Sequence, residues 1–161
     1  MIDTSAYMMR ISQAGPVQLI IINFEITLDF LAEAKKALLA QDSESFITGV
    51  QKAKNGLDQL IQSLNFEIPL ATDFNDIYRY VYKRLCDVHF SSEASACAKA
   101  VDEAVEILET LLVGWRDVEK QVESLPPADS GNPKVYSGLT YGRDGQAKEY
   151  VNEGEGRSYT V

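Results

Sequence analysis

The chain has 161 residues, which is enough for one domain with a hydrophobic core. Hydrophobic residues make up 45% and charged residues 24%, as in ordinary globular proteins. The net charge of −9 and the isoelectric point near 4.6 argue against binding to nucleic acid or anionic lipid, because both need clustered Lys and Arg.

The sequence also predicts a cytoplasmic protein without membrane insertion. Its longest uncharged apolar run, residues 17–24, is far shorter than the roughly 20 residues of a membrane-spanning helix. The N-terminus lacks the basic region of a signal peptide. Cys86 and Cys97 do not form a C-x-x-C motif, so we expect two free thiols in a reducing compartment.

Residues 1–15 are predicted to form a loose N-terminal arm with at most one short turn. Tyr7 and Ile11 make this arm more apolar than a free terminus requires. The first long helix is predicted over residues 16–39, because Pro16 suits the first helical position. The apolar side chains of this arm are therefore available to cover an exposed apolar surface of the helix that follows.

Apolar residues lie on two nearly opposite faces of this first helix. At 100° per residue, one face holds Ile20, Phe24, Leu28, Leu31 and Leu38, and the other holds Leu19, Ile22, Ile26, Phe30 and Ala37. A helix that is apolar all round is buried or bound on both sides. We therefore expect one face to pack in the core and the other to be a candidate partner-binding surface.

The spacing of apolar residues predicts three further helices. The second is capped by Asp42 or Ser43 and ends near Leu64, and the third is capped by Thr72 or Asp73. Ser91, Ser92 and Glu93 mark the start of the fourth, which reads from Ala94 and stops before Pro126. Long helices with short connections predict an all-α fold, an antiparallel up-down-up-down four-helix bundle over residues 16–125.

The composition changes at Pro126, and residues 126–161 form a predicted C-terminal extension rich in Gly, Ser, Asp and Glu. Two segments, residues 134–141 and 146–151, flank Asp144-Gly145, which predicts an extended, hairpin-like tail. A lone hairpin is only marginally stable in water. The tail is therefore expected to lie on another surface, and one hypothesis is that it occupies the partner-binding groove.

The sequence contains little catalytic chemistry. His89 is the single histidine, there is no Glu-x-x-His pair, and no glycine-rich phosphate loop is present, so we expect neither a metal nor another cofactor. Arg84 and His89 have the Arg-x-x-x-x-His spacing that is similar to the motif of HEPN-type helical ribonucleases. A histidine near a helix C-terminus is the simpler interpretation. We expect a non-enzymatic protein, with the ribonuclease as an alternative.

Several segments resemble the FliS family of flagellar secretion chaperones. Residues 14–20, Ala-Gly-Pro-Val-Gln-Leu-Ile, resemble the Ala-Ser-Pro-Glu-Gln-Leu opening of its first helix. Residues 74–85, Phe-Asn-Asp-Ile-Tyr-Arg-Tyr-Val-Tyr-Lys-Arg-Leu, resemble its Leu-x-x-Leu-Tyr-x-Tyr-Met-x-x-Arg-Leu helix. Leu111 and Trp115 match its Leu-x-x-x-Trp pair, and Tyr7 lies close to its N-terminal tyrosine.

The resemblance implies a bundle that binds the C-terminal segment of flagellin, prevents premature polymerisation and assists delivery to the type III export gate. In this family the N-terminal arm can occupy part of the client groove. The predicted partner-binding residues come from the arm, the second face of the first helix and the third helix: Tyr7, Ile11, Leu19, Ile22, Ile26, Phe30, Tyr78, Tyr80 and Tyr82. Gly15 and Val17 depart from the family pattern, so an adaptor for another protein is a further alternative.

Overall fold

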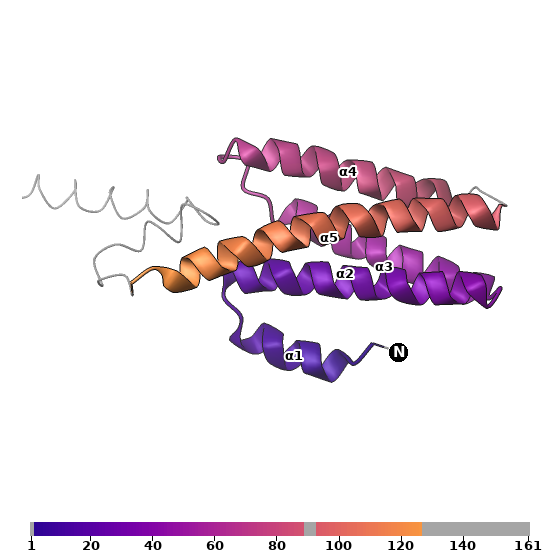
Figure 1. Ribbon diagram of the computed structural model, residues 1–161, viewed down its shortest axis with the longest axis horizontal. Helices are drawn as coiled ribbons and strands as arrows, with labels where there is room; N and C mark the ends of the chain where they lie inside the picture. The colour runs from indigo at the N-terminus through magenta and orange to yellow at the C-terminus, as the bar shows by residue number, and fades with distance from the viewer. Residues whose placement is uncertain (1, 89–92, 127–161) are drawn as a thin grey trace, which may run out of the picture.

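The computed structural model describes residues 2–88 and 93–126, and these ranges are helical with no strand among them. The helices are α1 (Thr4–Gln13), α2 (Pro16–Leu39), α3 (Ser43–Gln62), α4 (Leu70–Val88) and α5 (Ala94–Ser124) (Figure 1). The predicted all-α class is therefore confirmed for the described residues. None of these helices combines the length and apolar character needed to cross a membrane.

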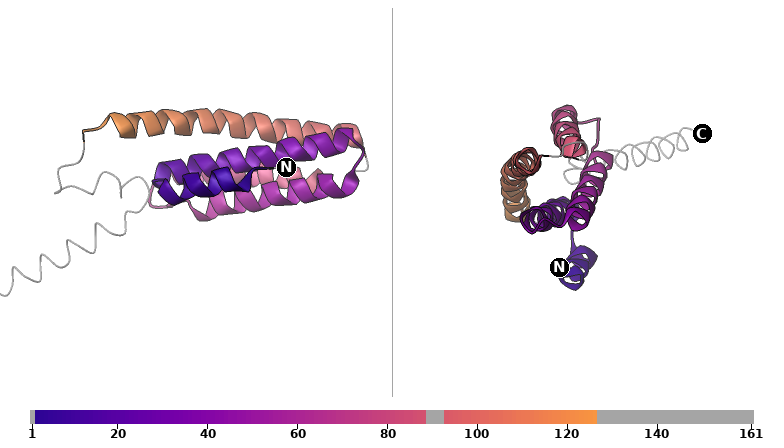
Figure 2. Two further views of the ribbon diagram at one scale, coloured as in Figure 1. Left: turned by 90° about the horizontal axis from the view of Figure 1, so that it is seen from below. Right: turned by 90° about the vertical axis from the view of Figure 1, so that its right-hand side faces the viewer.

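Helices α2 to α5 pack around a shared core. The main neighbours of α2 are α3 and α5, while α4 contacts the same two helices from the other side (Figure 2). Contacting residues run in opposite order along α2 and α5, since Glu25 pairs with Arg116 and Lys35 with Asp102. In this arrangement, each of the four helices directs one face into the core.

The face of α2 that enters the core carries Phe24, Thr27, Leu31 and Ala34, each fully buried. Phe24 and Leu31 belong to the first of the two apolar faces predicted from the sequence. Aromatic rings continue this core toward one end of the bundle, where Phe24 contacts Tyr78 and Phe74 lies between Tyr78 and Trp115. The core also contains aliphatic residues of α3, α4 and α5, among them Val50, Leu57, Leu85 and Leu108.

Several predicted boundaries agree with the structure. Helix α2 spans the predicted residues, and the carboxylate of Asp42 caps α3 by accepting a hydrogen bond from the Ser45 amide at 3.1 Å. Helix α5 ends at Ser124, before Pro126 as expected, because proline cannot continue the helical hydrogen bonds.

One predicted helix start is wrong. Helix α4 begins at Leu70 rather than at a Thr72 or Asp73 cap, because Pro69 fixes a helical φ and the Thr72 amide already donates to the Pro69 carbonyl. Helix α5 begins at Ala94, with Glu93 at its N-cap position, as the predicted start at residues 91–93 requires. Ser91 and Ser92 themselves lie outside the described residues.

The predicted loose arm is also wrong, because residues 4–13 form the regular helix α1. Asp3 caps this helix by accepting from the Ser5 amide at 3.1 Å. No residue of α1 is buried, and the helix lies outside the other four helices, beside α2 (Figure 2). Polar contacts with α2, described below, hold it there, and such long-range contacts leave no periodic pattern in a short segment.

Two expectations concern residues that the structure does not describe. The hairpin-like tail falls almost entirely within residues 127–161, and His89 falls within residues 89–92. Both expectations remain predictions.

Candidate partner-binding groove

A groove of about 410 Å³ runs between α2 and α3, and we call it the α2–α3 groove. Ile11 of α1 closes one edge. The remaining lining residues are Leu19, Ile22, Asn23, Ile26 and Phe30 from α2, and Lys52, Asn55, Gly56 and Gln59 from α3. The groove therefore brings together five residues of the predicted surface: Ile11, Leu19, Ile22, Ile26 and Phe30.

The floor of the groove is apolar and its α3 side is polar. Ile22 is almost fully buried, whereas Leu19 and Ile11 are 41% and 42% exposed. The Asn23 side-chain amide donates to Gln59 across the groove at 3.5 Å, and the Lys52 ammonium lies 5.3 Å from the centre of the Phe30 ring. Helix α3 thus covers only part of the second apolar face of α2.

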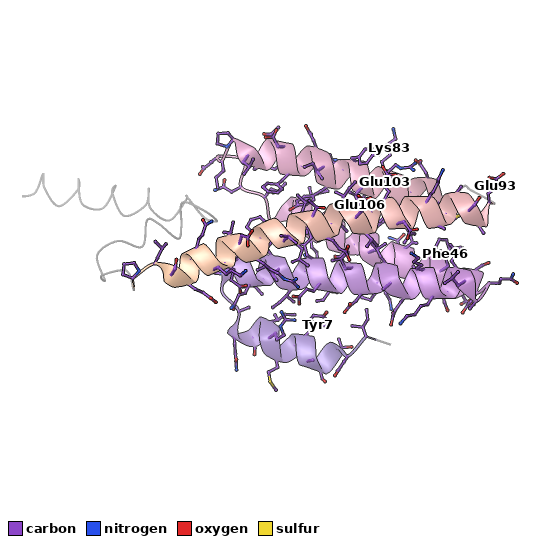
Figure 3. The ribbon with its side chains drawn as sticks, viewed as in Figure 1. Tyr7, Phe46, Lys83, Glu93, Glu103 and Glu106 are labelled. Carbon is purple, nitrogen blue, oxygen red and sulfur yellow. The ribbon has the colours of Figure 1, made fainter. Side chains whose placement is uncertain are left out.

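Helix α1 lies at the edge of this groove through two polar contacts. The Tyr7 hydroxyl donates to Asp29 Oδ2 at 2.6 Å, and Arg10 pairs with Glu25 at 2.5 Å. Figure 3 shows Tyr7 between α1 and α2. Partial burial, reinforced by the hydrogen bond to Asp29, raises the pKa of Tyr7 to about 12. Tyr7 thus positions α1 and does not line the groove itself.

The three tyrosines of α4 lie apart from the groove and from one another. Tyr78 is 1% exposed and packs in the core. The Tyr80 hydroxyl donates to the carboxylate of Glu103 on α5. Tyr82 lies on the α3 side, with the Lys54 ammonium 5.6 Å from the centre of its ring. The α2–α3 groove therefore unites the α1 and α2 residues but none of the α4 tyrosines.

A second hollow, which we call the Trp115 pocket, lies at the end of the bundle where α5 finishes. It has a volume of about 400 Å³ and a mainly apolar wall. The lining residues are Val17 and Ile20 from α2, Ser63, Leu64, Asn65 and Ile68 from the α3–α4 connection, Leu70, Ala71, Phe74 and Tyr78 from α4, and Thr110, Leu111, Gly114, Trp115 and Val118 from α5. Sequence reasoning missed this pocket. The spacing of Leu111, Trp115 and Val118 at i, i+4 and i+7 was the available pattern, and it marks one helix face.

The ribonuclease alternative has no assembled site in the described part of the chain. Arg84 lies against the Glu103 carboxylate at 2.9 Å and is 3.7 Å from Asp87, so carboxylates on two helices engage its charge. His89 is outside the described residues. Within the described ranges, no group of three or more His, Cys, Asp and Glu residues is placed to hold a metal ion.

The FliS family model, described as flagellar protein FliS, matches residues 3–122. The chain belongs to the FliS family. Proteins of this family are flagellar export chaperones rather than enzymes. A search of curated protein sequences finds no match to the chain.

The residues that match the family model include those that line both the α2–α3 groove and the Trp115 pocket. The match begins before α1 and ends within the last turn of α5. It confirms the resemblance found in the helix openings and in the tyrosine-rich third predicted helix. Residues 123–161 lie beyond the match.

Proposed function

We propose that this FliS-family protein binds the C-terminal segment of flagellin in the cytoplasm, keeps it from polymerising and assists its delivery to the type III export apparatus. The observation that supports this most directly is the α2–α3 groove, where five apolar residues from α1 and α2 meet on one surface. Contiguous apolar surface of this kind is typical of interaction sites.

The chemistry of the groove suits an amphipathic helix. Leu19, Ile26 and Phe30 offer apolar contacts at helical spacing, while Asn55, Gln59 and Lys52 line the opposite side with hydrogen-bonding groups. A client helix can place its apolar face on the first set and its polar flank on the second. Because the core beneath α2 is already packed, the groove keeps its shape before the client binds. The entropy cost of ordering then falls on the client segment alone.

Calorimetric titration with a peptide of the flagellin C-terminal segment from the same organism tests this function. We expect binding with a negative heat-capacity change, because apolar surface is buried, and a gain of helicity in circular dichroism. The absence of binding would overturn the proposal and favour the adaptor alternative.

A pair of variants tests the groove itself. Leu19→Asp places a charge on its apolar wall, and it lies near the N-terminus of α2, where the helix dipole tolerates an acid. We expect client affinity to fall at least about tenfold, which corresponds to about 1.4 kcal/mol. Val113→Asp is the matched control, since Val113 is 58% exposed on α5 and lines neither hollow. Equal losses in the two variants would count against this groove.

A further inference from the structure

We propose that the Trp115 pocket binds a segment of this chain's own C-terminal extension, residues 135–141, with a tyrosine as the inserted side chain. The proposal concerns a different surface from the α2–α3 groove and does not depend on flagellin binding. It rests on the chemistry of the pocket, on where the helix that builds it ends, and on the sequence that follows.

The pocket is shaped for an uncharged aromatic group that carries a hydrogen-bond acceptor. No charged residue lines it, and its wall includes the aromatic side chains of Phe74, Tyr78 and Trp115. Its volume of about 400 Å³ lies within the roughly 300–1,000 Å³ of ligand sites. The Trp115 indole Nε1 is buried beside the Tyr78 hydroxyl, but among the described residues no acceptor makes a hydrogen bond of regular geometry to it. A buried donor of this kind is costly unless an acceptor reaches it.

The chain leaves the bundle beside this pocket. Val118 lines the pocket and precedes the end of α5 at Ser124 by less than two helical turns, or about 9 Å. Figure 1 shows that α5 ends at the same end of the bundle as the start of α2 and α4. Residues 127–134 can span up to about 26 Å when extended, so residue 135 onward can reach back to the pocket.

The segment that follows has the composition that the pocket requires. Residues 135–141, Val-Tyr-Ser-Gly-Leu-Thr-Tyr, contain no charge and two tyrosines, Tyr136 and Tyr141. Each tyrosine offers a ring for the apolar wall and a hydroxyl oxygen to accept from the Trp115 N–H. Tyr150 and Tyr159 are less suitable, because Lys148, Glu149 and Arg157 accompany them and burying a charge in an apolar pocket is unfavourable. Covalent linkage gives this segment an effective concentration in the millimolar range.

Trp115 is the single tryptophan of the chain, so its fluorescence reports directly on the pocket. In the full chain we expect Tyr136→Ser/Tyr141→Ser to shift the emission to longer wavelength and to raise the acrylamide quenching constant at least twofold. Tyr150→Ser/Tyr159→Ser is the matched control and should behave as the wild type. Wild-type quenching in the first double variant would overturn the proposal.

Dilution separates the chain's own segment from that of a second copy. An intramolecular contact keeps the same quenching constant over a fiftyfold dilution, whereas an intermolecular one loses protection. Protection that disappears on dilution would overturn the proposal in favour of a second copy.

A variant on the pocket side gives an independent test. A Cβ at Gly114 meets no atom within 4 Å, so Gly114→Phe can fill the pocket mouth without a clash at that atom. We expect trypsin to cut the full chain after Lys134 and Arg143 at least fivefold faster than in the wild type. Val113→Phe, one residue away and outside the pocket, is the control. Equal cleavage rates in the two variants would overturn the proposal.

Discussion

Tyr78 shows how the environment of a single residue depends on the helices around it. Its ring lies 6.0 Å from that of Phe24 and 5.9 Å from that of Phe74, measured between centroids, and only 1% of the residue is exposed. Burial raises the pKa of Tyr78 to about 12, because the phenolate would have to form in an apolar surrounding. The ionisation of this residue therefore makes the stability of the folded protein depend on pH in the alkaline range.

We expect Tyr78→Phe to make unfolding less sensitive to alkali. An unfolded tyrosine ionises near pH 10, so between pH 10 and about 12 the unfolded chain releases this proton first and the folded state loses stability. The loss approaches 1.4 kcal/mol per pH unit for one group, to order of magnitude. Urea unfolding of both proteins at pH 9, 10 and 11 measures the difference. Parallel losses in the wild type and the variant would contradict this assignment.

At the scale of helices, α2 and α3 approach each other closely because two glycines of α3 face α2. A Cβ added at Gly49 would lie 2.9 Å from the Ala34 Cβ, and one added at Gly56 would lie 2.2 Å from the Thr27 hydroxyl oxygen. Thr27 is fully buried and its hydroxyl donates to the Asn23 carbonyl at 2.8 Å, so it cannot move away freely. Gly56 also lines the α2–α3 groove, so the helix spacing sets the width of that groove.

We expect Gly56→Ala to destabilise the protein although alanine favours helices. The gain in helix propensity is at most about 1 kcal/mol, whereas overpacking a tight contact costs about 1–3 kcal/mol. Thr27→Ala removes the clashing hydroxyl, so the double variant should recover most of the loss. Chemical denaturation of the two single variants and the double variant gives the coupling. Additive losses would show that the contact is not the cause.

Across the whole molecule, we expect α1 to open at a lower free energy than the four helices that form the core. The buried core draws on α2, α3, α4 and α5, whereas α1 contributes no buried residue and contacts mainly α2. Glu25 is one of two links between these parts, beside Asp29, and it accepts hydrogen bonds from Arg10 of α1 and from Arg116 of α5. Burial opposes the ionisation of Glu25, but these two guanidinium groups hold its pKa below the usual range.

Hydrogen exchange of the full chain should resolve this difference in stability. We expect α1 amides to exchange through local opening, far faster than the core amides of α2 to α5. Glu25→Gln weakens the pair with Arg10 and should speed α1 exchange about two- to fivefold, as the loss of a partly exposed ion pair predicts. Asp102→Asn, which breaks the Lys35 pair between α2 and α5, is the control and should leave α1 unchanged. Uniform protection of all five helices would contradict this view.

Local patterns in the sequence predict the long helices and the family. Pro16, Asp42 and Pro126 mark helix ends through local chemistry, and the apolar periodicity of α2 to α5 is strong because each helix has a buried face. The same local patterns carry the resemblance that the match over residues 3–122 confirms. The two apolar faces of α2 were likewise visible, since a helix repeats its faces by a fixed rotation.

Packing between the helices sets which surfaces remain open. Helix α1 depends on Tyr7 and Arg10 meeting Asp29 and Glu25, partners that lie on another helix. Periodicity places the three tyrosines on different sides of α4, but only the neighbouring helices show that Tyr78 is buried, that Tyr80 meets Glu103 and that Tyr82 faces Lys54. The Trp115 pocket exists because segments distant in sequence leave a gap at the end of the bundle. Periodicity tells which side chains share a face, but packing between helices sets how much of that face is covered.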